Sequence, residues 1–375
     1  MLNGKKLIFA AGGTGGHINP ALAVAGEVRR KYPDAQILFI GTAEKMEARL
    51  VPAAGFDFRT IQISGFNRVL NLNGIKQNIK TLSHLLKSAS QAKKIIKDFD
   101  PDVVIGFGGY VSGPVVRAAA KLGIPTAIHE QNAFPGVTNK ALAKMVDAVM
   151  LTAEQAKQYM QPKNPAIVTG LPIRGELLEA DRDVARAELG LDEKPLILSM
   201  GGSLGARAIN EAMLEVIANR WQGNDCWFMH ATGKDCKDFP ERLSEKGVDT
   251  ENKHIIIRDY IDDMARCLAA ADLVVCRAGA SSLSEFQAMG KPSILIPYPF
   301  ATENHQFHNA KALSDKGAAI VIEEKDLTPA LLMQHIDTLL ESPGRLGEMG
   351  KAAKAMAVTD AQQRIVEVLC KIVRK

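Results

Sequence analysis

The sequence predicts an α/β protein built from two similarly wound parallel-sheet domains. Short apolar strands alternate with helical patterns along the chain, as they do in parallel sheets that carry helices on both faces. A strand, a glycine-rich loop and a helix also occur twice, because residues 7–28 resemble residues 196–217. The chain has 375 residues, which is enough for two domains of ordinary size.

The first half begins with a predicted strand at Lys6–Ala10, which ends at the glycines of residues 12–16. Asn19 and Pro20 are predicted to start the next helix, with Asn19 as its cap and Pro20 at the first helical position. Further strands are predicted at 36–40, 102–107, 126–129 and 148–152. A second glycine loop, at 108–113, follows the strand at 102–107.

The second half restarts with a strand at Pro195–Met200, a glycine loop at 201–205 and a helix at Ala206–Asn219. Later strands are predicted at 254–257, 273–276, 293–296 and 319–322. We place the domain boundary near residue 170, which gives domains 1–170 and 171–357. The last helix, about 358–375, has no strand after it and is expected to pack back on the first domain.

Charge is divided unevenly between the halves. Residues 1–170 contain 21 Lys and Arg against 11 Asp and Glu, whereas residues 171–375 contain 25 against 31. A basic first half is expected to meet an anionic partner, such as a phosphate-bearing substrate, an acidic membrane surface or nucleic acid. The apolar runs are too short for a spanning helix, and the N-terminus does not resemble a signal peptide. Five cysteines without a CxxC pair predict reduced thiols in a cytosolic protein.

The three glycine loops predict phosphate binding. Glycine lets the backbone approach a phosphate closely, and a following helix points its first N–H groups at the negative charge. The dinucleotide-binding pattern is incomplete, because the frame that starts at Gly13 lacks its last glycine and the second strand ends at Gly41-Thr42 without an acid. The Walker A lysine is also missing. NAD and ATP are therefore disfavoured, and a different large phosphorylated ligand is expected.

Another cluster, Arg277 to Glu285, follows the strand that ends at Cys276. Its amides can hold a diphosphate, and Glu285 can accept hydrogen bonds from both hydroxyls of a ribose. The alternative is an ordinary helix start in which Glu285 forms a capping box with Ser282. Residues 298–306 add polar donors after the next strand, at the sheet edge where open α/β sheets bind ligands.

Two residues are candidate general bases. His17 closes the first glycine loop, and its alternative role is a hydrogen bond to the loop or to a phosphate. Glu130 lies in the His-Glu-Gln-Asn sequence of residues 129–132. Asp181 and Asp183 match a manganese-binding Asp-x-Asp pair by letter, but their place before a helical pattern favours N-terminal helix charge. We expect no metal and no cofactor, so that loop amides and helix dipoles stabilise the diphosphate.

A basic amphipathic stretch covers residues 69–97, which contain no Asp or Glu. Its apolar residues recur at three- and four-residue steps, which indicates one helical face. Such a helix either lies on an anionic membrane surface or packs its apolar stripe on the sheet. Nucleic acid fits poorly, because no aromatic residues are interleaved. The positive charges are Lys76, Lys80, Lys87, Lys93, Lys94 and Lys97.

Five segments, in this order along the chain, resemble the MurG family of bacterial peptidoglycan N-acetylglucosaminyltransferases: Gly12–His17, Gly108–Gly113, His129–Asn132, Gly201–Ala206 and Arg277–Glu285. The resemblance implies two Rossmann-like domains that face each other across a cleft, the glycosyltransferase B fold. It implies inverting transfer of N-acetylglucosamine from UDP-N-acetylglucosamine to the 4-hydroxyl of an undecaprenyl-diphosphate-linked N-acetylmuramyl-pentapeptide. It also implies a peripheral protein on the cytoplasmic face of the inner membrane, which works with other cell-wall synthesis proteins in cell shape and division.

The resemblance also implies the roles of individual residues. Residues that contact the transferred sugar or line the cleft are Thr14, Gly15, Gly16 and Asn132. In the second half the implied contacts are Arg174 and Ser203 with nucleotide and diphosphate, Ile261 with uracil through its backbone, Ala280, Ser281, Ser282, Leu283, Ser284 and Glu285 with phosphate and ribose, and Gln306 with sugar hydroxyls. Where some relatives carry two adjacent glutamines, this chain has His305-Gln306. Two alternatives stay open: a UDP-N-acetylglucosamine epimerase of related fold and a non-catalytic nucleotide-sugar sensor.

Overall fold

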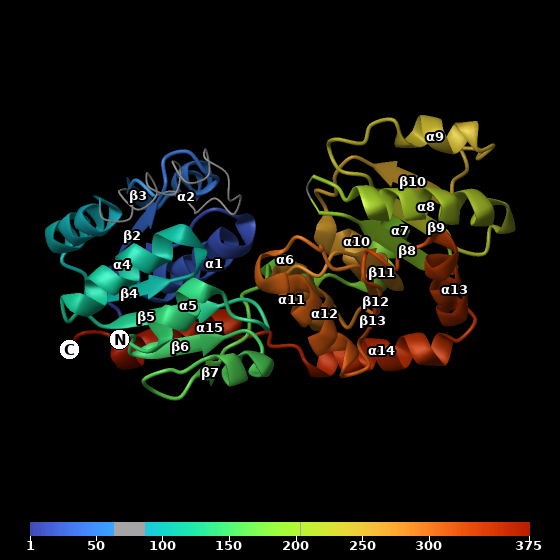
Figure 1. Ribbon diagram of the computed structural model, residues 1–375. Helices are drawn as coiled ribbons and strands as arrows, with labels where there is room; N and C mark the ends of the chain where they lie inside the picture. Colours follow the sequence, from blue (N-terminus) through green and yellow to red (C-terminus); the bar gives the residue numbers. More distant parts are fainter. Residues whose placement is uncertain (64–86, 203) are drawn as a thin grey trace. The chain divides into compact units, whose positions relative to one another are not determined.

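The computed structural model describes residues 1–63, 87–202 and 204–375. Two compact units divide the chain: unit 1 contains Met1–Ile173 and Asp360–Lys375, and unit 2 contains Arg174–Thr359. Each unit is a parallel sheet with helices on both faces (Figure 1). The predicted fold class is therefore confirmed. Lys76, Lys80 and Ser203, which the sequence analysis singled out, lie outside the described residues.

Unit 1 contains a seven-stranded sheet in the order β3-β2-β1-β4-β5-β6-β7. The strands, in chain order, are β1 (Lys6–Ala10), β2 (Gln36–Gly41), β3 (Asp57–Thr60), β4 (Val103–Gly106), β5 (Thr126–Glu130), β6 (Ala148–Leu151) and β7 (Ile167–Val168). The chain winds outward from β1 to β3 and then returns to β4 beside β1, where Ala10 pairs with Gly106. This reversal creates the crevice at the carboxyl ends of the strands where such sheets bind ligands.

The helices of unit 1 cover both faces of this sheet, and the buried apolar side chains form one cluster on each face. The helices are α1 (Gly15–Lys31), α2 (Glu47–Ala53), a helix at residues 87–99, α4 (Gly109–Lys121), α5 (Val137–Ala143), the 3-10 helix η1 (Glu154–Tyr159) and α15 (Ala361–Ile372). The last of these, α15, joins the same face as α1 by burying Ile365, Val366 and Leu369. Its Gln362 side chain donates a hydrogen bond to the Ile173 carbonyl at 2.9 Å.

Unit 2 repeats this winding in a six-stranded sheet with the order β10-β9-β8-β11-β12-β13. Its strands are β8 (Leu196–Met200), β9 (Trp227–Ala231), β10 (Ile255–Arg258), β11 (Leu273–Cys276), β12 (Ser293–Leu295) and β13 (Ala319–Val321). The order reverses between β8 and β11, as it does between β1 and β4 in unit 1.

The helices of unit 2 are α6 (Gly175–Glu179), α7 (Arg182–Glu188), α8 (Arg207–Arg220), α9 (Phe239–Glu245), α10 (Met264–Ala270), α11 (Ala280–Met289), α12 (His305–Ser314), α13 (Pro329–Leu340) and α14 (Pro343–Ala355). Two short 3-10 helices, η2 (Trp221–Gly223) and η3 (Thr302–Asn304), complete the unit. Buried side chains again form a cluster on each face of the sheet.

The predicted start of the first helix is wrong. Helix α1 begins at Gly15 with Thr14 as its N-cap, and Pro20 lies inside the helix. A proline there removes one backbone hydrogen bond, but Ile18, Val24 and Val28 are buried, and this packing holds the helix together across the proline. As a result His17 lies in the first helical turn.

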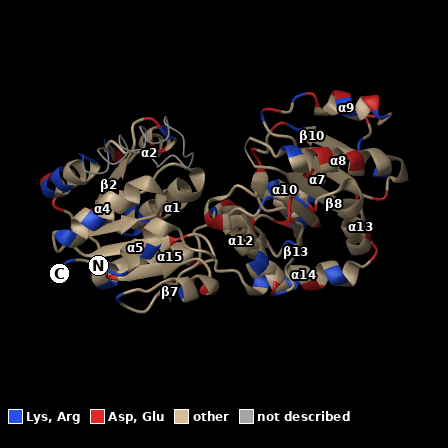
Figure 2. Cartoon of the chain, viewed as in Figure 1, with Lys and Arg blue, Asp and Glu red and all other residues tan. Residues whose placement is uncertain are grey.

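The described part of the basic stretch, helix 87–99, packs on unit 1. Ala92 and Ile96 are buried in the core of that unit. The lysines of the helix are exposed, namely Lys87, Lys93, Lys94 and Lys97. The core-packing interpretation therefore holds for this part of the stretch, while its lysines remain on the surface of unit 1 (Figure 2).

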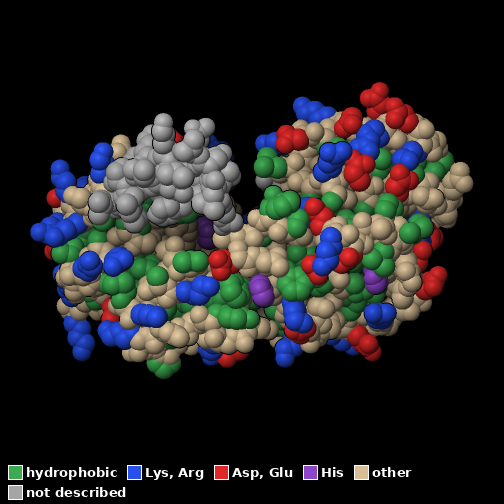
Figure 3. Space-filling model, in the orientation of Figure 1, with side chains coloured by type: hydrophobic (Ala, Val, Ile, Leu, Met, Phe, Trp, Pro, Cys, Tyr) green, Lys and Arg blue, Asp and Glu red, His purple; other side chains and the backbone are tan. Residues whose placement is uncertain are grey.

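Surface charge differs between the units. In the view of Figure 3, Lys and Arg outnumber Asp and Glu over unit 1, whereas both signs are mixed over unit 2. Acidic residues of unit 2 are prominent on α8 and α9 (Figure 2). This distribution follows the unequal division of charge in the sequence.

Candidate active site

The two glycine loops of unit 1 touch at the crevice between β1 and β4. A Cβ atom on Gly109 would lie 2.2 Å from the Gly12 carbonyl oxygen, and Gly109 has a φ of +75°. Ser112 fixes the second loop, because its hydroxyl accepts a hydrogen bond from the Gly108 N–H at 2.9 Å. The same hydroxyl lies 2.9 Å from the Ala10 carbonyl at the end of β1. Only glycine allows the two loops to approach this closely.

Glu47 holds the first glycine loop from inside the protein. This fully buried carboxylate accepts a hydrogen bond from the Gly13 N–H at 3.1 Å. It also accepts bonds from the Thr42 N–H at 3.0 Å and the Thr42 hydroxyl at 2.7 Å. The Gly13 N–H therefore donates to the Glu47 carboxylate, whereas the loop amides of a dinucleotide-binding protein donate to a phosphate. The sequence analysis missed Glu47, whose only signal is an acid five residues after Thr42.

The predicted base His17 lies at the mouth of this crevice. Its half-buried ring belongs to the first turn of α1, and Nδ1 lies 3.0 Å from Oε1 of Gln131. Gln131 is buried directly after β5. Thr14, Gly15 and Gly16, the other loop residues that the resemblance implies, form the N-cap and first positions of the same helix. Thr14 and Gly16 are exposed there.

Glu130, the second candidate base, holds a loop together. One oxygen accepts hydrogen bonds from the backbone and side-chain nitrogens of Asn132, at 3.0 and 3.1 Å. The other accepts from the Gly136 N–H at 3.2 Å and from Asn139 Nδ2 at 2.8 Å. Only 2% of Glu130 is exposed. Two of these four bonds position Asn132, and all four occupy the Glu130 carboxylate, so His17 is the more accessible of the two candidate bases.

In unit 2 the loop after β8 packs on the loop after β9. A Cβ atom on Gly205, whose φ is +84°, would lie 2.2 Å from the Thr232 carbonyl oxygen. The same carbonyl accepts a hydrogen bond from Asn210 of α8 at 2.8 Å. The close contact of two loops at the carboxyl ends of the strands therefore occurs in both units.

Helix α11 begins in the cluster predicted to hold a diphosphate. It starts at Ala280 with Gly279 as N-cap, and no side chain caps it. The first N–H groups of the helix, from Ala280 to Ser282, therefore have no partner within the helix and carry partial positive charge. The alternative interpretation of a capping box between Ser282 and Glu285 is wrong, because Glu285 is the sixth helical residue and a capping box needs the third.

Glu285 lies about one turn further along α11. It follows Leu283 and Ser284, which are buried. Its side chain is 15% exposed, and its Oε1 accepts a hydrogen bond from Arg174 Nε at 3.1 Å. Burial raises the pKa of the Glu285 carboxyl above its usual range, while the positive charge of Arg174 opposes that rise. Arg174 is half exposed and also lies 3.3 Å from Glu176.

Gln306 joins the loops that follow β11 and β12. Its Oε1 accepts hydrogen bonds from the Ala278 N–H at 3.2 Å and the Tyr298 N–H at 3.0 Å. Arg277 supports the same loops through its bonds to the carbonyls of Ile296 and Pro297, at 3.1 and 3.3 Å. Gln306 is thus fixed by its carbonyl oxygen at the carboxyl edge of the sheet, at the start of α12 beside His305.

Two other sequence predictions have clear structural outcomes. Ile261 follows β10 with its side chain buried in the core of unit 2, which is consistent with an interaction through its backbone. Asp181 is the N-cap of α7 and accepts hydrogen bonds from the backbone of Asp183 and Val184, at 2.9 and 3.0 Å. The helix-start interpretation of the Asp-Arg-Asp sequence is therefore confirmed.

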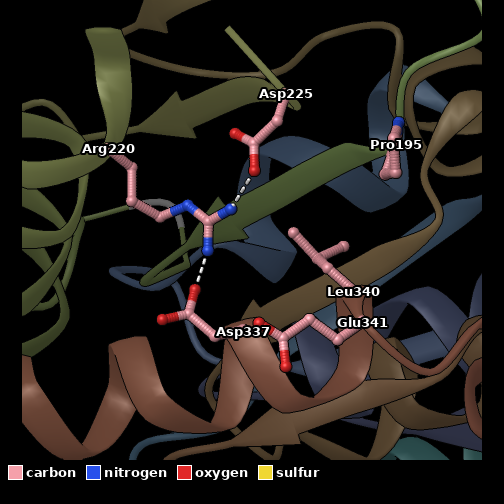
Figure 4. A pocket seen from close by; sticks show the side chains of 6 residues that line it. All are labelled: Pro195, Arg220, Asp225, Asp337, Leu340 and Glu341. Atoms are coloured by element: carbon pink, nitrogen blue, oxygen red, sulfur yellow. Dashed lines mark hydrogen bonds and ion pairs between the residues drawn. The ribbon is translucent and has the colours of Figure 1, made fainter. Parts of the chain in front are cut away.

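A surface pocket of unit 2 lies away from these residues (Figure 4). It is lined by Pro195, Arg220, Asp225, Asp337, Leu340 and Glu341. The Arg220 guanidinium pairs with both Asp225 and Asp337, which neutralise its charge. Pro195 precedes the first residue of β8, so the pocket lies at the edge of the sheet opposite the glycine loops. It is not part of the candidate site.

Each unit places its loops at the carboxyl ends of the strands, where open α/β sheets bind their ligands. Residues 7–151 match the glycosyltransferase family 28 N-terminal domain, and residues 196–365 match its C-terminal domain. The fold and the site therefore define a family 28 glycosyltransferase, a hexosyltransferase.

Similar sequences narrow this class further. The chain is 45% identical, over 98% of both chains, to the UDP-N-acetylglucosamine–N-acetylmuramyl-(pentapeptide) pyrophosphoryl-undecaprenol N-acetylglucosamine transferase of Acetivibrio thermocellus. It is 43% identical to an enzyme of the same name from Bacillus cereus, over 99% of this chain and all of the other. The chain belongs to the family of these N-acetylglucosamine transferases.

Solved structures agree with this family. The structure of MurG from Acinetobacter baumannii matches 98% of this chain and 99% of its own, with a TM-score of 0.79 and 32% identity. The structure of a UDP-N-acetylglucosamine 2-epimerase described as putative, from Listeria monocytogenes, matches with a TM-score of 0.67 but only 17% identity, over 97% of this chain and 95% of its own. The epimerase alternative thus rests on a shared fold alone.

The contact between the glycine loops predicts the effect of adding one methyl group. Gly109→Ala forces a side chain into the left-handed region and against the Gly12 carbonyl, so we expect a loss of about 3 kcal/mol or more of unfolding free energy. Gly123→Ala is the matched control, because Gly123 has a similar φ of +72° and no atom within 4 Å of its Cβ position. It should lose only about 1–2 kcal/mol. Urea unfolding followed by circular dichroism measures both, and equal losses would contradict the contact.

Proposed function

We propose that this protein transfers N-acetylglucosamine from UDP-N-acetylglucosamine to the 4-hydroxyl of an undecaprenyl-diphosphate-linked N-acetylmuramyl-pentapeptide. The observation that carries the proposal is 45% identity, across 98% of both chains, to a relative named for that reaction. The arrangement of polar groups in each unit supports it. Such a reaction is a step in the synthesis of the bacterial cell wall.

Unit 2 binds the sugar donor in this proposal. The uncapped N-terminus of α11 offers the N–H groups of Ala280, Ser281 and Ser282 to the diphosphate, where the helix dipole favours negative charge. Glu285 accepts hydrogen bonds from the two ribose hydroxyls, and the charge of Arg174 favours the ionised form of that carboxyl against the effect of burial. Ile261 offers its backbone to uracil. Gln306 uses its carbonyl oxygen within the protein, which leaves its Nε2 amine to donate to a sugar hydroxyl.

Unit 1 binds the acceptor and supplies the base. His17 takes the proton of the 4-hydroxyl as that oxygen attacks C1 of N-acetylglucosamine from the face opposite the phosphate. The bond from C1 to the phosphate oxygen breaks, UDP leaves with the bonding electrons, and the configuration at C1 inverts. Asn132 and the loop residues Thr14, Gly15 and Gly16 contact the sugars beside this proton transfer. The helix dipole at α11 stabilises the charge that develops on UDP.

The acceptor carries a lipid, so the proposal places unit 1 at an anionic membrane surface as a peripheral protein. Within the described ranges, none of the helices has the length and apolar character needed to cross a bilayer. The exposed lysines of helix 87–99 support the surface interaction, because each basic side chain near an anionic membrane contributes about 1 kcal/mol to binding. Other cell-wall synthesis proteins are proposed partners on the same surface.

Release of UDP tests the reaction. UDP should form from UDP-N-acetylglucosamine only when the lipid-linked muramyl-pentapeptide is present, because the acceptor hydroxyl is the nucleophile. His17→Ala should lower kcat by about 10²–10⁴-fold with an unchanged Kd for the sugar donor, since a general base contributes that much. Conversion of the donor to an isomeric UDP-sugar without acceptor and without net UDP release would favour the epimerase, and an intact sugar donor in the presence of acceptor would favour a sensor.

Glu285→Ala should weaken binding of UDP-N-acetylglucosamine by about 10–100-fold, because two hydrogen bonds to a carboxylate are lost. Glu176→Ala is the matched control: it removes the other carboxylate beside Arg174, one that is 61% exposed, and should change affinity by less than about twofold. Isothermal titration of both variants gives the comparison. Affinity that is unchanged in Glu285→Ala, or lost equally in both variants, argues against Glu285 as the ribose ligand.

Charge reversal tests the membrane face. The double variant Lys93→Glu and Lys94→Glu should weaken co-sedimentation with phosphatidylglycerol vesicles by about tenfold or more, because two attractive charges become repulsive. The double variant Lys316→Glu and Lys351→Glu changes the net charge equally, but at exposed positions of unit 2. It should bind vesicles nearly as the wild type does. Equal loss in the two double variants would show an effect of net charge without a specific face.

A further inference from the structure

A chain of hydrogen bonds inside unit 1 ends at the ring of His17. The Gly170 carbonyl lies 2.8 Å from Nε2 of His129. The other ring nitrogen of His129, Nδ1, lies 3.2 Å from Nε2 of Gln131. The amide oxygen of Gln131 then lies 3.0 Å from Nδ1 of His17. Groups from three distant segments, at residues 17, 129–131 and 170, are thereby connected in one line.

The carbonyl at the far end fixes the direction of every hydrogen bond in this chain. A carbonyl oxygen only accepts, so Nε2 of His129 carries a hydrogen. His129 is fully buried, and burial lowers its pKa to about 4, so the ring is neutral at pH 7. Nδ1 of His129 therefore has a lone pair and accepts from the Gln131 amine. The same amine also donates to the His129 carbonyl at 3.1 Å, which fixes the amide orientation a second time.

With its amine turned toward His129, Gln131 presents its oxygen to His17. Nδ1 of His17 must then donate, because the opposite tautomer would place two lone pairs against each other. We propose that Gln131 is a positioning residue that holds neutral His17 with its proton on Nδ1 and its lone pair on Nε2, ready to take the proton of the acceptor hydroxyl. This inference rests on the proposed function for the role of His17 as base.

A glutamine suits this position better than a carboxylate. A carboxylate beside Nδ1 would stabilise the charged imidazolium and raise the pKa of His17. A neutral amide selects the same tautomer without adding charge beside the ring. The buried position of Gln131, which is only 3% exposed, keeps water from replacing this bond.

Gly108 leaves the space that the bond requires. Its φ is +95°, and a Cβ atom there would lie 2.7 Å from Nδ1 of His17 and 3.4 Å from Oε1 of Gln131. The second glycine loop thus has a role beyond phosphate binding, because it makes room for the contact between the histidine and the amide.

The nearby carboxylates Glu47 and Glu130 are already bonded to other groups of unit 1. Glu47 accepts from Gly13 and Thr42, and Glu130 accepts from Asn132, Gly136 and Asn139. His129 is the other histidine of this hydrogen-bond series, and burial keeps it neutral. Gln131 is therefore the group through which the tautomer of His17 is set.

Nitrogen NMR on the 15N-histidine-labelled full chain tests the tautomer without any substrate. The signals of His17 are identified among the eight histidines by their loss in His17→Ala. In the wild type at pH 8 we expect a protonated Nδ1 and an unprotonated Nε2 for His17. A protonated Nε2 in the wild type overturns the inference, whether or not the protein transfers sugar.

Kinetics of two variants test the consequence for the reaction. Gln131→Met removes the hydrogen bond while keeping the length of the side chain, and kcat should fall by at least about tenfold with an unchanged Kd for UDP-N-acetylglucosamine. Gln131→Glu keeps an acceptor at Nδ1 but adds charge, so the acidic limb of the kcat/KM profile should move up by about one pH unit or more. A merely structural role would not move that limb, and an unmoved limb in a folded Gln131→Glu variant overturns the inference.

Discussion

The site depends on the close approach of loop backbones at the point where each sheet reverses its winding. In unit 1 the Gly12 carbonyl leaves no space for a side chain on Gly109, and in unit 2 the Thr232 carbonyl leaves none on Gly205. Parallel strands bring successive loops to one edge of the sheet, and glycines let those loops pack directly on one another. The positions of His17 in unit 1 and of the neighbouring helix starts follow from this packing.

The two units use similar loops for different purposes. In unit 1, buried carboxylates take the loop amides: Glu47 binds Gly13, and Glu130 holds the loop of Asn132. These bonds make a frame in which the His17 ring and the Gln131 amide face each other. In unit 2, α11 starts without a side-chain cap, which leaves its positive end for an external anion. In unit 1 the loop amides therefore bind carboxylates of the protein itself. In unit 2 the amides at the uncapped start of α11 are proposed to bind a substrate.

The sequence predicts the repeated winding well, because apolar strands and glycine loops are local patterns. Prediction from the sequence fails where packing between distant segments determines the local structure. Pro20 lies within α1 because the buried face of that helix outweighs the lost hydrogen bond, and β9 was missed although it is a fully buried strand between β8 and β10. Glu285 is singled out by its motif as a predicted ribose ligand. Gln131 and Glu47 are not, because their partners His17 and Gly13 are distant in sequence and no local pattern connects them.

The return of α15 to unit 1 affects the order in which the protein is made. Residues 174–359, which form unit 2, are continuous in sequence and leave the ribosome before the last helix. Until Ile365, Val366 and Leu369 emerge, the core beside α1 stays open to water. The unit translated first is therefore completed last, which reverses the usual order in which domains fold from the N-terminus during synthesis. A ribosome that stops before Asp360 would release a chain whose second unit is whole and whose first unit is not.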